Sequence, residues 1–123
     1  MSKPGGSLLQ TIELARRIVD VIADKKGEDI LLLDIRNVSL ITDYFILCSG
    51  TSDRQLQAIE EGIEEVAKKT FDARPWHVEG EAASGWVLMD YGDIVVHIFE
   101  PQQRHYYDLE SLWKEAHVVL RVQ

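Results

Sequence analysis

The chain has 123 residues, a net charge of −8 from 13 basic and 21 acidic side chains, and a single cysteine. Its length fits one ordinary domain, and a hydrophobic content of 46% is enough for a core that needs neither disulfides nor metal. The acidity argues against extensive contact with a nucleic-acid backbone, which binds clustered Lys and Arg. It is compatible with a basic protein partner, although charge alone favours the simpler interpretation that the acidity keeps the protein soluble. Cys48 cannot form an internal disulfide, which fits a reducing compartment.

The first part of the chain predicts a leader, a helix and two buried strands. Residues 1–6 are expected to form a flexible leader. A helical stripe of apolar residues then predicts a helix over about 7–26, with Gly27 at the position after its end. Strands are expected over 29–36 and 43–49. The first is expected to be mostly buried. The second is apolar on both faces, which is typical of a sheet covered on two sides.

Gly50 ends the second strand, and Ser52 with Gln55 resembles a capping box that begins another helix. This junction could also be interpreted as a phosphate site, since helix N-termini attract anions. It lacks the Walker spacing and the dinucleotide fingerprint, so ordinary capping is favoured. The exposed face of this second helix carries four acids: Glu60, Glu61, Glu64 and Glu65.

The second half of the chain predicts a hairpin. An extended segment is expected over 75–80, followed by strands over 85–91 and 94–99 that are joined by Gly92-Asp93, a pair suited to a type II′ turn. Asp108 could cap a short helix. The tail over 117–123 is ambiguous.

The resulting order of elements, α-β-β-α-β-β-β-α, predicts an α/β fold with a mixed β-sheet of about five strands flanked by helices. A single domain is expected over residues 7–116, with 117–123 as a C-terminal tail. No apolar run approaches the roughly 20 residues of a membrane span. Met1 to Gln10 shows no targeting signal, which favours a cytoplasmic protein.

The hairpin is expected to present two unlike faces. One face is the predicted core and holds Val87, Met89, Tyr91, Ile94, Val96 and Ile98. The other mixes aromatic, apolar and charged groups: Trp86, Leu88, Asp90, Val95, His97 and Phe99. Such a mixture is typical of an interface, but a face covered by a helix remains open.

Three features of the sequence invite a catalytic or metal-binding interpretation. Asp90 and His97 are expected as diagonal neighbours on one face, yet no nucleophile accompanies them, so a polar contact in a binding face is favoured. Two-metal nucleotidyl transfer requires closely spaced carboxylates, whereas Asp90 and Asp93 straddle a turn without an Asp-x-Asp pair. Cys48 and the four histidines show no zinc-ligand spacing, so we expect no metal and no cofactor.

Three segments together resemble one known family, the Iojap proteins, also called ribosomal silencing factors. The segments are Asp43-Tyr-Phe-Ile-Leu-Cys-Ser-Gly-Thr-Ser-Asp-Arg-Gln55, Trp86-Val-Leu-Met-Asp-Tyr-Gly-Asp-Ile-Val-Val-His-Ile-Phe99 and Arg104-His-Tyr-Tyr-Asp-Leu-Glu-Ser-Leu-Trp113. The resemblance covers about residues 8–115, and the hairpin segment is its most specific part.

The resemblance implies a nucleotidyltransferase-like fold without the catalytic acids, and therefore a protein that is not an enzyme. It implies binding to the large ribosomal subunit, chiefly through large-subunit ribosomal protein fourteen, at the face where the subunits meet. Occupying that face would block joining of the small subunit and repress translation when nutrients are short. The family also suggests a homodimer when free and little direct nucleic-acid contact. The alternatives are a metal-dependent nucleotidyltransferase and a generic dimeric adaptor.

The partner surface is expected to centre on Trp76, which could also fold over the core. Trp and Tyr side chains give large contact areas, and aspartates supply the charge that a basic partner would meet. The expected contact residues are Trp76, Met89, Asp90, Tyr91, Asp93 and His97. Met89 and Tyr91 belong to the core face, but they lie near the turn, where its cover could run out.

Overall fold

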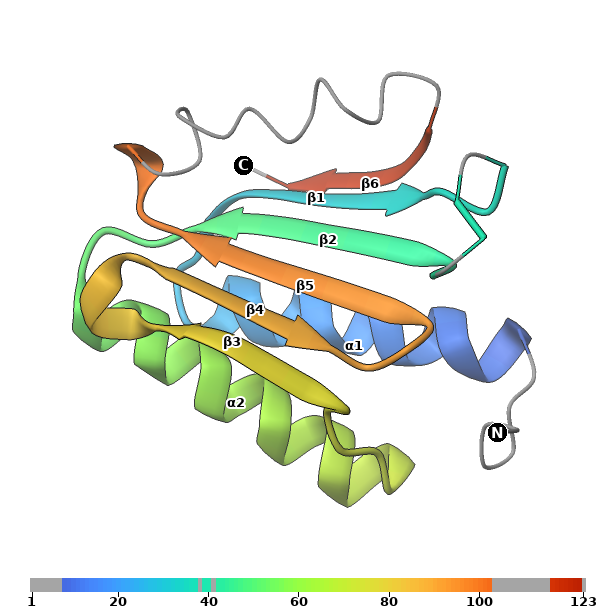
Figure 1. The fold of residues 1–123 in the computed structure, drawn as a ribbon, viewed down its shortest axis with the longest axis horizontal. Helices are drawn as coiled ribbons and strands as arrows, with labels where there is room; N and C mark the ends of the chain where they lie inside the picture. Colours follow the sequence, from blue (N-terminus) through green and yellow to red (C-terminus); the bar gives the residue numbers. More distant parts are fainter. Residues whose placement is uncertain (1–7, 38, 41, 103–115, 123) are drawn as a thin grey trace.

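The computed structural model describes residues 8–37, 39–40, 42–102 and 116–122, and it shows a sheet with two helices packed on one face (Figure 1). The six strands are ordered β3-β4-β5-β2-β1-β6. Helix α1 packs against β1 and β2, and helix α2 packs against β4 and β5. The expected α/β fold with a mixed sheet flanked by helices is confirmed, with six strands in place of about five.

The elements follow the expected order closely. The bounds are α1 Leu8–Asp24, β1 Glu28–Asp34, β2 Tyr44–Ser49, α2 Asp53–Phe71, β3 His77–Glu81, β4 Trp86–Asp90, β5 Ile94–Phe99 and β6 His117–Val122. A 3-10 turn over Ala82–Ser84 separates β3 from β4. The short helix expected near Asp108 lies outside the described residues.

The end of α1 differs from the expectation at one residue. Lys26, not Gly27, adopts the left-handed conformation, with φ of 68°. Gly27 follows it and donates from its amide to the Ile22 carbonyl at 2.8 Å. A β-carbon on Gly27 would lie 2.4 Å from Cγ2 of Ile22. Glycine is therefore required here for close approach, and the positive φ falls on the residue before it.

The strand-to-helix junction at Gly50 is a helix cap that also joins the two helices. The hydroxyl oxygen of Ser52 accepts from the Gln55 amide at 3.1 Å, so the expected capping is confirmed. The Gln55 side chain accepts from the Thr51 amide at 2.7 Å. It also donates to the carbonyls of Lys25 and Lys26, at 3.1 and 2.7 Å. One glutamine thus caps the start of α2 and holds the end of α1 beside it.

The face of the sheet under the helices carries the main core. The hairpin register is the expected one, with Leu88 opposite His97 and Asp90 opposite Val95. The alternate residues of both strands therefore point toward the helices, as the sequence pattern predicts. All six hairpin residues assigned to this face belong to the main cluster: Val87, Met89, Tyr91, Ile94, Val96 and Ile98.

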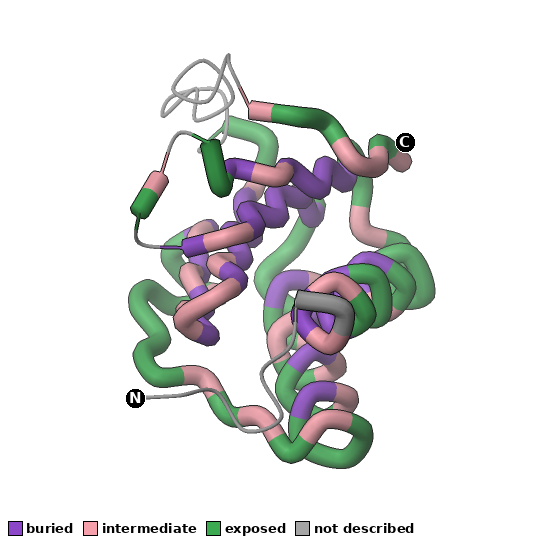
Figure 2. The backbone as a smooth tube through the Cα atoms, turned by 90° about the vertical axis from the view of Figure 1, so that its right-hand side faces the viewer, coloured by how far each residue is buried: buried purple, intermediate pink, exposed green. Residues whose placement is uncertain are grey.

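The opposite face has a second, smaller apolar cluster. It includes Leu31, Leu33, Ile35, Phe45, Leu47 and Phe99, with Trp86 and Val95 packed at its edge. Neither α1 nor α2 lies on this face (Figure 1). Strand β2 is buried along its whole length, so the expectation of a strand buried on both sides is confirmed. The backbone tube in Figure 2 shows this burial concentrated in the central strands and in the inner faces of the helices.

His97 is the polar member of this second cluster, and its side chain is only 8% exposed. Its ring lies 4.7 Å from that of Phe45 and stacks at 5.4 Å on that of Phe99. The indole nitrogen of Trp86 donates to Nδ1 of His97 at 3.5 Å. Burial lowers the pKa of His97 from its ordinary value of 6.5 to about 4, because the charged imidazolium would lose its hydration.

The C-terminal segment, expected as a tail whose structure the sequence left ambiguous, contains a strand of the sheet. Residues His117–Val122 form β6, which pairs antiparallel with β1. Val118 lies opposite Leu33, and Leu120 lies opposite Leu32. The sequence was ambiguous because an edge strand is half-exposed and its polar and apolar residues show no clean alternation.

We expect Val96→Asp to destabilise the fold severely. Val96 is fully buried between the sheet and the helices, so the substitution places an unpaired charge among apolar side chains. The cost should be about 3–5 kcal/mol, a large share of a typical 5–15 kcal/mol total. Chemical denaturation measures the loss. The control is Val78→Asp on the exposed edge strand, which should cost about 1 kcal/mol or less. Equal losses in the two variants would contradict the assignment of the core face.

We expect His97 to make stability fall as the pH is lowered below about 6.5. In the unfolded chain its pKa returns to about 6.5, so between that value and about 4 the unfolded state binds a proton that the folded state does not. The contribution of neutral His97 to the free energy of unfolding is complete above pH 6.5 and is lost progressively toward pH 4. The free energy of unfolding of wild type should therefore drop between pH 7 and 5 by about 2 kcal/mol more than that of His97→Gln. Identical pH dependence in the two proteins would show that His97 titrates normally.

Candidate partner-binding site

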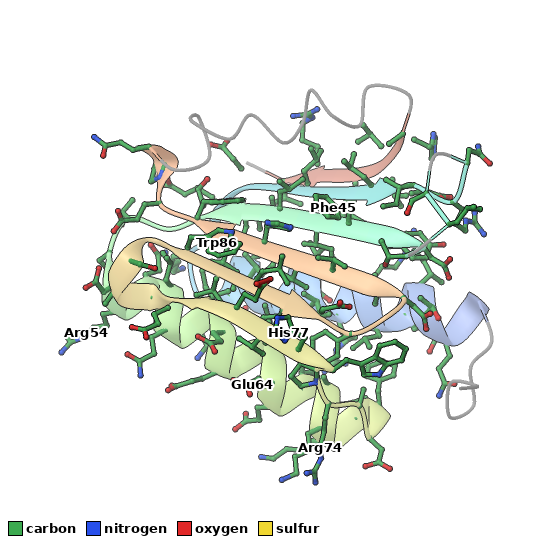
Figure 3. The ribbon with its side chains drawn as sticks, viewed as in Figure 1. Phe45, Arg54, Glu64, Arg74, His77 and Trp86 are labelled. Carbon is green, nitrogen blue, oxygen red and sulfur yellow. The ribbon has the colours of Figure 1, made fainter. Side chains whose placement is uncertain are left out.

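The most exposed aromatic side chain among the described residues is Trp76, at 63% exposure. It precedes β3 by one residue and follows Arg74 and Pro75, and Figure 3 shows Arg74 near the C-terminal end of α2. Its amide donates to the Asp90 carbonyl at 2.7 Å, which extends the pairing of β3 with β4 by one residue. Its ring lies over Gly92, where an added β-carbon would stand 2.9 Å from two ring carbons. Trp76 is therefore held in place while most of its surface faces outward.

The β4–β5 turn beside Trp76 is fixed by its own hydrogen bonds. The Asp90 carboxylate accepts from the Gly92 amide at 2.7 Å, and the Tyr91 amide donates to the Ile94 carbonyl at 2.8 Å. Gly92 has a φ of 88°, and Asp93 does not share this positive φ, a combination that agrees with the expected type II′ turn. Asp90 and Asp93 are both half-exposed. The turn thus presents two carboxylates next to an exposed indole ring.

Three of the expected contact residues are buried, which corrects the sequence-based expectation for them. Met89 is fully buried, and Tyr91 and His97 are each 8% exposed. Met89 and Tyr91 both belong to the main core cluster, so the cover of the core face does not run out at the turn. His97 is enclosed by aromatic rings on the other face. Direct contact with a partner therefore remains a prediction for Trp76, Asp90 and Asp93 alone.

Tyr91 is buried in an unusual environment. Its hydroxyl has no hydrogen-bond partner within the described part of the chain. Burial raises the pKa of Tyr91, and the carboxylates of Glu64 and Glu60 on α2 raise it further. The neutral phenol is thus favoured, and the acidic face of α2 begins close to the base of the turn.

The pairing of Asp90 with His97 as an acid–base couple is not formed. The two residues share a face of the hairpin, as the register predicts. However, the Asp90 carboxylate accepts from the Gly92 amide, and the His97 ring accepts from the indole of Trp86. Figure 3 shows Trp86 and Phe45 on the face of the sheet turned toward the viewer, away from the helices. His97 therefore belongs to an aromatic cluster.

No group of three or more His, Cys, Asp or Glu side chains among the described residues is placed to hold a metal ion. None of the described helices is long and apolar enough to cross a membrane.

The sequence interpretation missed Leu40, in the loop between β1 and β2. Its side chain is fully exposed, at 104% of the reference value. Its only signal in the sequence is an apolar residue inside a short polar connection, which does not distinguish exposure from burial.

Comparison with known proteins gives one consistent family. A family model described as "Ribosomal silencing factor during starvation" matches residues 9–123. The ribosomal silencing factor of Bacillus subtilis is 46% identical over 93 residues, which cover 76% of this chain and 78% of that protein. A crystal structure of a Chromobacterium violaceum protein matches with a TM-score of 0.77 at 34% identity, over 83% of this chain and 84% of that one.

A more distant relative from Mus musculus is the mitochondrial assembly of ribosomal large subunit protein 1. It is 32% identical over 98 residues, which cover 78% of this chain and 43% of that protein. The chain thus spans less than half of that relative but most of the bacterial ones. The family match extends through β6, and the solved structure shares the fold as well as the sequence. The resemblance noted in the sequence is confirmed: this chain belongs to the ribosomal silencing factor family.

Proposed function

We propose that this protein binds the large ribosomal subunit through large-subunit ribosomal protein fourteen and blocks joining of the small subunit. Bound at the face where the subunits meet, it would repress translation under nutrient limitation. It would act in the cytoplasm and by occupancy alone, without a catalytic step. A homodimer would be its state when free.

The observation that carries this proposal is the family match over residues 9–123, whose description names ribosomal silencing during starvation. The name of the mouse relative adds the large subunit. The surface supports the same conclusion, because the exposed Trp76 stands beside two half-exposed aspartates on a protein of net charge −8. An aromatic anchor bordered by carboxylates suits a basic protein surface.

Truncation of the aromatic anchor should weaken binding to the large subunit strongly. Trp76→Ala removes the exposed ring, which for a desolvated anchor commonly costs about 2 kcal/mol or more, roughly thirtyfold in affinity. Co-sedimentation with purified large subunits measures the loss, and joining of small subunits to the same particles measures the silencing activity. Trp76→Phe keeps an aromatic ring and should retain part of the binding.

The fold should tolerate the same change. Most of the indole is exposed, and the contact with Gly92 is lost, so stability should fall by about 1 kcal/mol. Normal sedimentation of Trp76→Ala would show that Trp76 is not the anchor. The acidic face of α2 would then be tested first.

Neutralising one aspartate should have a smaller effect that depends on salt. Asp93→Asn preserves the shape of the side chain and removes one charge that a basic partner would meet. Affinity should fall roughly twofold at low salt, mainly through slower association, and the difference should vanish at high salt. Glu28→Gln removes one exposed charge at the opposite end of the sheet and should change neither quantity. Equal effects of the two variants would indicate that only net charge matters.

A further inference from the structure

The exposed surface of Trp76, Asp90 and Asp93 is by itself too small for a stable protein–protein complex. A specific interface buries about 800 Å² on each partner. One aromatic side chain supplies about 150–250 Å² of this area. Trp76 with Asp90 and Asp93 therefore falls well short, and the surface has to continue onto other elements.

The exposed apolar side chains show where it continues. Among the described residues, four large apolar side chains are exposed: Leu40, Trp76, Val78 and Val118. All four lie at the same end of the sheet. Trp76 and Val78 are at the start of β3, Leu40 is in the loop between β1 and β2, and Val118 is at the start of β6. This is the right-hand end of the sheet in Figure 1, and we call it the turn end.

The strand register shows that the residues of the turn end form one continuous row across the sheet. His77 at the start of β3 pairs with Asp90 at the end of β4, and Ile94 at the start of β5 pairs with Tyr44. Asp34 at the end of β1 pairs with Tyr44 on one side and with His117 of β6 on the other. Five spacings of about 4.8 Å make this end about 24 Å wide. A square patch of 800 Å² is about 28 Å on a side, so the turn end spans most of the width of one interface.

Hydrogen bonds tie the segments of the turn end to one another. The carbonyl of Asp93 accepts from the amides of Asp43 and Tyr44, both at 3.0 Å. The Ile35 amide donates to the Asp43 carbonyl at 3.0 Å, and the Ser39 amide donates to the Ile35 carbonyl at 2.8 Å. Together with the hydrogen bond from the Trp76 amide to the Asp90 carbonyl, these backbone hydrogen bonds link the segment of Trp76 to Ser39, the residue before Leu40.

The charge of the turn end is also suited to one kind of partner. Asp43, Asp90 and Asp93 lie between the two apolar ends and are half-exposed. Arg36 lies at the same end and donates to both carboxylate oxygens of Asp34, at 2.9 and 2.6 Å, and its charge also interacts with that of Asp43. That guanidinium holds the pKa of Asp34 below its usual range and neutralises its charge. The remaining acids favour a basic surface opposite them.

We propose that the whole turn end, from Trp76 to Leu40 and the start of β6, is a single docking surface for a basic protein of the large ribosomal subunit. Trp76 and Leu40 are its two apolar anchors, and Asp43, Asp90 and Asp93 form the acidic strip between them. This inference rests on the proposed function and adds Leu40, Val118 and Asp43 to the contact surface.

Co-sedimentation of variants with purified large subunits tests this proposal. Leu40→Ala should reduce affinity about fivefold to tenfold and leave the thermal melt unchanged, because Leu40 is fully exposed. Combined with Trp76→Ala, the fold-losses should multiply, since the two sites are roughly 15 Å apart, across about three strand spacings. Val118→Ala should weaken binding a few-fold. Its matched control, Val122→Ala at the opposite end of β6, should bind as wild type does.

The outcomes separate the two proposals. If wild type does not sediment with large subunits, the proposed function fails and this inference fails with it. If wild type binds and Trp76→Ala loses binding while Leu40→Ala and Val118→Ala both bind normally, the function stands and the extended surface is overturned. If Leu40→Ala binds large subunits normally but shifts a free dimer to monomer in size-exclusion chromatography, the surface belongs to a second copy of this chain and the proposal is likewise overturned.

Discussion

The parallel pairing of β2 with β5 is the constraint on which the rest of the structure depends. Tyr44 lies opposite Ile94, and the register continues without interruption to Ser49 and Phe99. Parallel neighbours cannot be joined by a tight turn, so the chain must cross over between them. Here the crossover contains α2, β3 and β4, which places α2 on one face and the β3–β4 pair at one edge. The start of β2 and the start of β5 consequently meet at the same end of the sheet.

This meeting gives the candidate surface its rigidity. The turn before β5 and the loop before β2 are far apart in sequence, yet the Asp93 carbonyl accepts hydrogen bonds from both Asp43 and Tyr44. Trp76 is held against the same turn through Gly92. A surface organised in this way loses little conformational freedom on binding, because its side chains stand on backbone that is already ordered. An exposed tryptophan on a mobile loop would incur a larger entropic cost.

Much of the fold could be predicted because its signals are local. Ser52 with Gln55 marked the start of α2, and Gly92-Asp93 set the hairpin register that assigned every residue of β4 and β5 to a face. The edge strand β6 could not be assigned, because half-burial leaves no clear periodicity. The site was predicted less well for a related reason. Alternation along a strand shows which face Met89, Tyr91 or His97 occupies, but it does not show how far α2 or the aromatic cluster covers that face.

The aspartates of the turn end are arranged differently from the converging carboxylates of a two-metal site. Metal-assisted phosphoryl transfer needs carboxylates that converge on one point with free oxygens. Here Asp34 directs both oxygens to Arg36, and Asp90 directs one to the Gly92 amide. Asp93 holds the loop before β2 through its main-chain carbonyl. The four acids therefore lie at the ends of four different strands. Three of these residues, Asp34, Asp90 and Asp93, take part in fixing the local structure. A row of carboxylates between two apolar anchors suits recognition of an extended basic surface better than capture of a single ion, because the charge is distributed over roughly the width of a protein interface.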